Sequence, residues 1–112
     1  MTLDEFERTV FQVAYSSALC GIPEIYRRTP TSETVRVPLV KGGFVDAFFN
    51  AETGTMAFAY IRQDQRVFGA DNTGGWHLHP FENPAEHRRL TKEMTFVDFI
   101  LAIERHYANQ GV

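Results

Sequence analysis

Apolar residues recur at helical spacing near both ends of the chain. The first run begins at Leu3 and predicts a helix over residues 3–17, and the second begins at Phe96 and predicts a helix over residues 96–108. At the start of each run, a threonine is followed three positions later by an acidic residue, which is the pattern of a capping box. These pairs are Thr2 with Glu5 and Thr95 with Asp98.

Between the two helices, apolar and polar positions alternate as they do in strands with one buried face. Short turns rich in Gly, Asn and Asp separate these segments, which is typical of an antiparallel meander. Pro38 cannot donate a hydrogen bond to a neighbouring strand, so its segment is expected to be an edge strand or to contain a bulge. The predicted strands cover residues 24–29, 33–41, 44–49, 55–62 and 66–70.

These elements predict an α+β fold, in which an antiparallel β-meander of about four to five strands packs against an N-terminal and a C-terminal helix. The 112 residues suit a single α+β domain spanning 1–112. Ten Phe, four Tyr and one Trp are many for this length, and they predict a core built largely from aromatic rings.

Charge and cysteine content narrow the classes of function. The net charge of −3 gives no overall attraction for nucleic acid, so any contact with RNA or DNA must come from a local group of arginines. A single cysteine, Cys20, fits a reducing compartment. The sequence shows neither a signal peptide nor an apolar run long enough to cross a membrane. We therefore expect a cytoplasmic protein that does not bind membranes.

Residues 71–90 break the alternating pattern and hold three of the four histidines, two adjacent glycines and the only tryptophan. We predict a long ordered loop here, and loops of this length are often functional. In extended backbone, His77 and His79 point to the same side, while Trp76 and Leu78 point to the other side and into the core.

One interpretation of this segment is a metal site. His77 and His79 can bind one ion, with His87, Asp71 or Glu82 completing the ligand set, and a transition metal such as zinc suits imidazole ligands. The competing interpretation needs no cofactor, because both rings can instead form hydrogen bonds that hold a tight loop together.

A second interpretation is acid–base catalysis without a metal ion. Cleavage of RNA needs a base, an acid and a cation that stabilises the developing charge. His77 and His79 are candidates for the first two roles, because imidazole exchanges protons near neutral pH. Arg88, Arg89 and Arg66 are the candidate cations, although a pair of adjacent arginines is more often a solvated loop end.

Other chemistry is less strongly indicated. Asp71-Asn72 before Gly74-Gly75 is typical of a turn, and a nest of backbone N–H groups that binds an anion is the alternative. Asp46 lies among aromatic residues, but a surface position on a half-exposed sheet explains it equally. No nucleophile elbow, P-loop, Rossmann fingerprint or paired C-x-x-C motif is present, which disfavours serine hydrolases, nucleotide-binding folds and zinc ribbons.

The order of elements over residues 34–108 resembles the TumE-type toxins of toxin–antitoxin pairs. The resemblance rests on a meander, an Asp-Asn at a strand end, a group of histidines and a Phe-rich closing helix; the polar positions are Asp71, Asn72, His77, His79 and His87. The sequence departs from the family in its Thr-Gly-Gly-Trp insertion and in having His-Leu-His where the family has adjacent histidines.

The resemblance implies an antitoxin-like protein partner and an activity on RNA. The expected catalytic residues are then His77, His79, Arg88 and Asp71, and the expected substrate-binding residues are Asn72, Trp76, Arg66 and Arg89. Two other hypotheses stay open. One is a non-catalytic protein-interaction domain, for which a homodimer is one form, and the other is a metal-binding protein that uses His77, His79 and His87.

Overall fold

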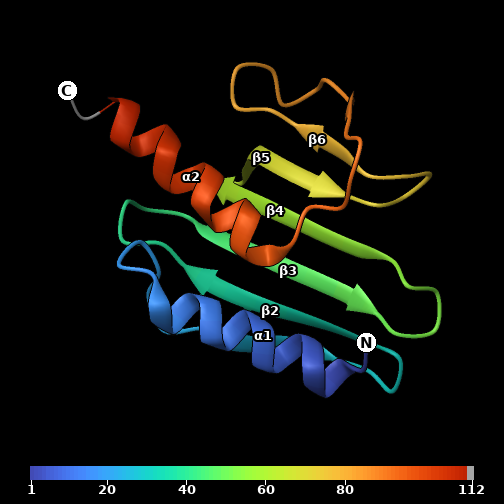
Figure 1. Ribbon diagram of the computed structural model, residues 1–112. Coiled ribbons are helices and arrows are strands. Elements are labelled where there is room, and N and C mark those ends of the chain that lie inside the picture. Colours follow the sequence, from blue (N-terminus) through green and yellow to red (C-terminus); the bar gives the residue numbers. More distant parts are fainter. Residues whose placement is uncertain (111–112) are drawn as a thin grey trace.

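The computed structural model describes residues 1–110 as an α+β fold. Seven antiparallel strands form one open sheet, and two helices lie on the same face of it (Figure 1). Within the described residues, no helix has the length and apolar character needed to cross a membrane. Among residues 1–110, the other face of the sheet carries no helix (Figure 1).

The strands follow one another across the sheet in chain order, so each pairs with its neighbours in the sequence. Short hairpins make this order possible, because an antiparallel pair needs only a tight turn. The strands are β1 (Glu24–Arg28), β2 (Ser32–Pro38), β3 (Phe44–Asn50), β4 (Met56–Arg62), β5 (Gln65–Asp71), β6 (His77–His79) and β7 (Arg88–Arg89).

Strict alternation along the strands decides which side chains face the helices. In β3, Val45 and Ala47 are fully buried beneath the helices, whereas Phe44, Asp46 and Phe48 are half-buried on the uncovered face. Asp46 there accepts two hydrogen bonds from Arg36 on β2, so it is a paired surface carboxylate.

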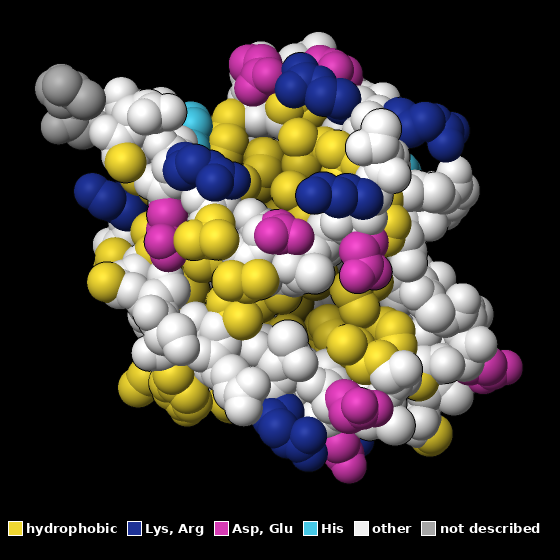
Figure 2. Space-filling view, in the orientation of Figure 1, with side chains coloured by type: hydrophobic (Ala, Val, Ile, Leu, Met, Phe, Trp, Pro, Cys, Tyr) yellow, Lys and Arg dark blue, Asp and Glu magenta, His cyan; other side chains and the backbone are white. Residues whose placement is uncertain are grey.

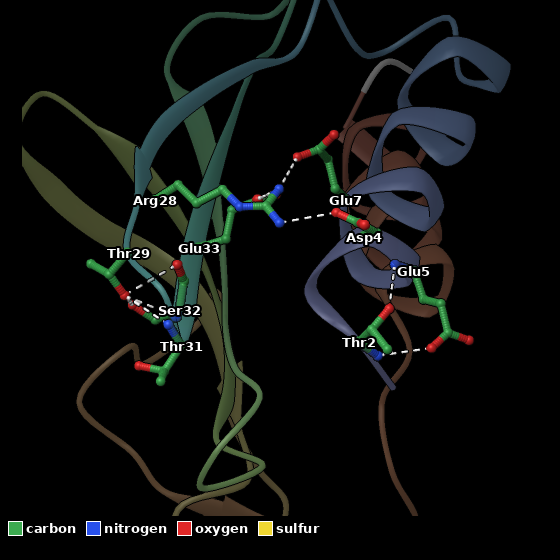
Figure 3. Close-up of polar contacts among 9 residues, drawn as sticks. All are labelled: Thr2, Asp4, Glu5, Glu7, Arg28, Thr29, Thr31, Ser32 and Glu33. Atoms are coloured by element: carbon green, nitrogen blue, oxygen red, sulfur yellow. Dashed lines mark hydrogen bonds and ion pairs between the residues drawn. The ribbon is translucent and has the colours of Figure 1, made fainter.

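The helix α1 (Leu3–Ser16) begins with the predicted capping box, since Thr2 and Glu5 exchange hydrogen bonds of 3.1 and 2.8 Å. Its buried side chains, Leu3, Phe6, Val10 and Ala14, recur on one face. The helix is also tied to the sheet by Arg28 on β1, whose guanidinium contacts Asp4, Glu7 and the buried Glu33 of β2 (Figure 3).

The helix α2 (Phe96–Gln110) covers the middle of the sheet with an aromatic layer. Phe99 is fully buried and lies 5.4 Å from Phe58 of β4 and 4.9 Å from Phe68 of β5, measured between ring centroids. The predicted Phe-rich core is therefore present. Between the two helices, apolar side chains reach the surface in a shallow groove (Figure 2).

The prediction of four to five strands was too low, because residues 71–90 contribute β6 and β7. These strands have only three and two residues, and the glycines and prolines around them hide the alternation. Pairing with β5 supplies the hydrogen bonds that make so short a segment extended. The predicted long loop is thus two short strands joined by turns.

The prediction for Pro38 was also wrong in its main part, because β2 lies between β1 and β3 and is not an edge strand. Pro38 is the last residue of β2, where β1 has already ended, so no neighbour needs its missing N–H. The register shift in this region falls in β1, between Ile25 and Arg27.

Candidate functional site

A pocket of about 420 Å³ opens beside β5 and β6 and is lined mainly by polar side chains. It brings together four of the predicted catalytic or metal-binding residues and one predicted substrate-binding residue. The lining residues are Arg66, Asp71, Thr73, His77, His79 and His87.

The hairpin between β5 and β6 sets the geometry of this pocket. Gly74 and Gly75 have φ values of 68° and 103°, which let the chain reverse sharply after Asp71. The return strand then places His77 directly opposite Asp71 and His79 opposite Gly69. His77 and His79 point to the same side, as predicted, while Trp76 and Leu78 pack against the core.

Backbone carbonyls fix the orientation of two imidazoles. Nδ1 of His77 lies 3.1 Å from the Gly75 carbonyl, and Nδ1 of His79 lies 2.9 Å from the Glu86 carbonyl. Because a carbonyl only accepts, each Nδ1 carries the hydrogen. The Nε2 atoms face the Asp71 carboxylate at 3.2 Å from His77 and 3.5 Å from His79.

The segment between β6 and β7 folds back and closes the pocket on one side. It buries His79, whose side chain is only 3% exposed, and it brings His87 within 4.5 Å of the His79 ring and 5.2 Å of the His77 ring, centroid to centroid. One ring nitrogen from each of these three histidines lies within 4.8 Å of the other two. His87 itself stays exposed.

Arg66 places a positive charge at the edge of the pocket. Its Nη2 donates to the Pro84 carbonyl at 3.1 Å and lies 3.3 Å from Nδ1 of His79. Burial, and then the charge of Arg66, lower the pKa of His79 below its usual value. The aliphatic part of the Arg66 side chain also passes over Gly69 of β5. A Cβ at that position would lie only 2.9 Å from Cδ of Arg66.

The other predicted site residues lie outside the pocket. Arg88 forms ion pairs with Glu82 and Glu86, so neither Arg88 nor the candidate ligand Glu82 points at the histidines. Asn72 holds the turn, since its amide donates to the Gly54 carbonyl and its oxygen accepts from the Met56 N–H.

Two further candidates border the site without lining it. Trp76 packs against Phe58 in the core, with ring centroids 6.2 Å apart. Arg89 pairs with His77 across the strands, and its guanidinium passes beside Gly75.

Thr73 is the one lining residue that sequence reasoning did not select. Its N–H donates to Oδ1 of Asp71 at 3.0 Å, which helps to hold the carboxylate toward the histidines. The Asp-Asn-Thr order was a signal for such a turn, because Asp side chains often accept from the N–H two residues later.

Within the described chain, the pocket is thus an arrangement of three imidazoles, one carboxylate and one guanidinium. These groups can hold a cation among the nitrogen atoms, and the guanidinium can contact an anion beside them. Searches with protein-family models, among curated proteins and among solved structures found no match to this chain.

Proposed function

We propose that the protein acts on single-stranded RNA, which lies across the uncovered face of the sheet with a phosphodiester at the His pocket. One observation carries this proposal. A row of directly paired residues on that face runs from Phe48 through Ala57 to Asp71 and His77, so an aromatic ring and the pocket lie at two ends of one row across the sheet.

The residues in and beside this row suit an unpaired nucleotide strand. Single-stranded RNA is commonly bound by bases that stack on aromatic side chains and by arginines that contact phosphates. Phe44 and Phe48 are half-buried on this face, with small Ala57 and Ala59 beside them. Arg66 and Arg89 form no ion pair with an acidic side chain among residues 1–110, so two guanidinium groups are available to phosphates at the pocket end of the row.

The geometry also narrows the chemistry. Arg66 lines the pocket, so it is the arginine best placed to act as the cation that stabilises charge on the reacting phosphate. His79 is poorly suited to exchange protons with a substrate, because it is buried and its Nδ1 is held by a carbonyl. Activation of the attacking hydroxyl therefore falls to His77 and His87, or to a group that they hold at the open side of the pocket.

The experiment compares RNA binding and cleavage by wild type, Phe48→Ala and Arg66→Gln. We expect the loss of one stacking ring to weaken binding of a short single-stranded RNA by about 1–3 kcal/mol. Arg66→Gln should reduce cleavage more than binding. Arg8→Gln on α1 is the matched control, because it removes the same charge from the helix-bearing side. Equal affinities and cleavage rates for all four proteins would contradict the proposal.

A toxin-like role, with an antitoxin-like partner, is part of the same proposal. Growth arrest on expression of wild type, but not of Arg66→Gln, would support it.

The alternative of a protein-interaction domain is favoured by β1, an edge strand whose five residues are all exposed, including Ile25 and Tyr26. A second copy of the chain or an antitoxin-like partner would pair there. Such pairing does not compete with RNA on the open face.

A further inference from the structure

The hydrogen-bond pattern of the His pocket leaves two nitrogen lone pairs without a donor. His77 and His79 each use Nδ1–H to donate to a carbonyl, at 3.1 and 2.9 Å. In the neutral ring, Nε2 is then an acceptor. Each Nε2 faces Asp71, which as a carboxylate also only accepts. Hydrogen-bond acceptors on the two imidazoles thus face acceptors on the Asp71 carboxylate. All three side chains are at most 20% exposed.

A single proton would satisfy only one of these lone pairs, whereas a proton on each Nε2 or a shared cation would satisfy both. Two protons would make two imidazolium rings with centroids 5.2 Å apart, and the Arg66 guanidinium already lies 3.3 Å from one of them. Three positive charges would then surround one carboxylate. A single metal ion instead accepts both lone pairs and also binds the carboxylate, whose Oδ1 faces His77 and whose Oδ2 faces His79.

The distances fit such an ion. In a tetrahedral site with metal–nitrogen bonds of about 2.0–2.1 Å, neighbouring ligand atoms lie about 3.3 Å apart. The separations from Oδ1 of Asp71 to Nε2 of His77, 3.2 Å, and from Oδ2 to Nε2 of His79, 3.5 Å, are close to that edge, with each nitrogen facing a different carboxylate oxygen. One ring nitrogen from each of the three histidines lies within 4.8 Å of the other two, and His87, the exposed one, is the side chain that would move to bring these nitrogens to ligand distance.

The surroundings also match those of metal-binding histidines. A ligand histidine usually donates its second ring N–H to a carbonyl or carboxylate, which fixes the ring and the tautomer. Gly75 and Glu86 provide those carbonyls here. The glycine-rich turn and the fold-back segment that bring them into place are therefore part of the site and not only connections between strands.

We propose that His77, His79 and His87 bind one divalent transition-metal ion, with Asp71 as the fourth ligand. Three imidazoles and a carboxylate in this arrangement suit Zn²⁺ best, and Co²⁺ can replace it as a spectroscopic probe. The inference does not depend on the RNA activity. If both hold, the bound ion is the group that His77 and His87 present at the open side of the pocket.

The test uses tag-free protein stripped with a chelator and titrated with Zn²⁺ or Co²⁺. Binding is followed by calorimetry, and the coordination geometry by the visible absorption of Co²⁺. We expect one ion per chain, a tetrahedral cobalt spectrum and a higher melting temperature with Zn²⁺. Failure to bind either ion at one per chain would overturn the proposal.

Asparagine variants separate ligation from folding. In His79→Asn, the side-chain amide can still donate to the Glu86 carbonyl, but the Nε2 ligand is gone. His87→Asn removes a ligand from an exposed position, where folding is not at risk. Both should bind Zn²⁺ at least about tenfold more weakly than wild type, as expected for a lost ligand.

His106→Asn is the matched control, because this histidine stacks on Phe81 outside the pocket. It should bind Zn²⁺ as wild type does. Wild-type affinity in both ligand variants, or an equal loss in His106→Asn, would overturn the site. RNA binding is also measured in the presence of a chelator, where no metal ion contributes to it. The RNA proposal and the metal proposal can therefore fail independently of each other.

Discussion

Two polar clusters lie at opposite edges of the sheet and differ in what they lack. In the Arg28 cluster, one guanidinium donates to Asp4, Glu7 and Glu33, so a donor group meets three acceptor groups and joins α1 to the sheet (Figure 3). In the His pocket, the Nε2 atoms of His77 and His79 meet the carboxylate of Asp71. The first cluster leaves Oε1 of the buried Glu33 without a hydrogen-bond partner among residues 1–110, whereas the second leaves two Nε2 atoms facing a carboxylate.

The comparison teaches how to separate structural from functional polar groups. Both clusters contain a buried ionisable residue, Glu33 in one and His79 in the other. Burial alone does not distinguish them. The arrangement of the unsatisfied groups does, because the Arg28 cluster leaves a single carboxylate oxygen, whereas the His pocket directs acceptors from three side chains at one another, an arrangement that suits a cation.

The largest effect is expected in the core that supports both clusters. Phe99 is fully buried against Phe58 and Phe68, so Phe99→Ala should lower the free energy of unfolding by about 3–5 kcal/mol. Urea denaturation measures the loss. Val97→Ala, at a position 44% exposed on the same helix, should change it by less than about 0.5 kcal/mol. Similar losses in both variants would mean that α2 is not packed as described.

The Arg28 cluster should make the free energy of unfolding depend on pH. Burial, and then the neighbouring Glu7, raise the pKa of Glu33 from 4.5 to about 7, against the opposing effect of Arg28. Between these two pH values the folded state binds more protons than the unfolded state. The contribution of Glu33 to stability is therefore fully present below pH 4.5 and is lost as pH rises through about 7.

Urea unfolding of wild type and Glu33→Gln at several pH values isolates this contribution. The difference between their unfolding free energies should change by about 2 kcal/mol between pH 5 and pH 8, because glutamine does not titrate. Carboxylates that do not interact with Glu33 are present in both proteins and cancel, whereas the neighbouring Glu7 titrates together with Glu33, so the change belongs to this pair. A difference that stays constant with pH would show that Glu33 keeps an ordinary pKa.

The smallest effect is expected in the His pocket without metal. His79→Ala leaves the Glu86 carbonyl without its donor, so we expect a loss of about 1–2 kcal/mol in chelator-treated protein. His79→Asn should lose less, because its amide can replace Nδ1–H. Thermal unfolding of the two variants side by side measures the difference. A loss in both as large as that of Phe99→Ala would make the pocket a structural cluster like that of Arg28.

Much of the fold followed from the spacing of apolar residues. Both helices and the first five strands begin within a few residues of their predicted positions, and both capping boxes form. Periodicity succeeds there because each element buries one continuous face. It failed for β6 and β7, since strands of three and two residues are held by pairing, β6 with β5 and β7 with β6, and not by their own pattern.

The sequence indicated most of the residues that line the candidate site, but not how they are arranged. Alternation correctly placed His77 and His79 on one side, and the end of β5 placed Asp71 beside them. Nothing local to Arg88 indicated that Glu82 and Glu86 would hold it away from the histidines. The sequence also could not show which two backbone carbonyls orient the imidazole rings. Every residue has a carbonyl, and only the fold decides where it points.

The strict chain order of the strands has a consequence for how the protein folds. Sheets whose pairings join neighbouring segments need little loop closure, and proteins rich in such local contacts fold fast. The whole His pocket is built from residues 66–87 and can assemble as one hairpin-sized unit. The end of α1, in contrast, is joined to α2 by a hydrogen bond from Ser17 to Glu104, which lies 87 positions later. We therefore expect the hairpin that carries the pocket to form before α1 has settled against α2.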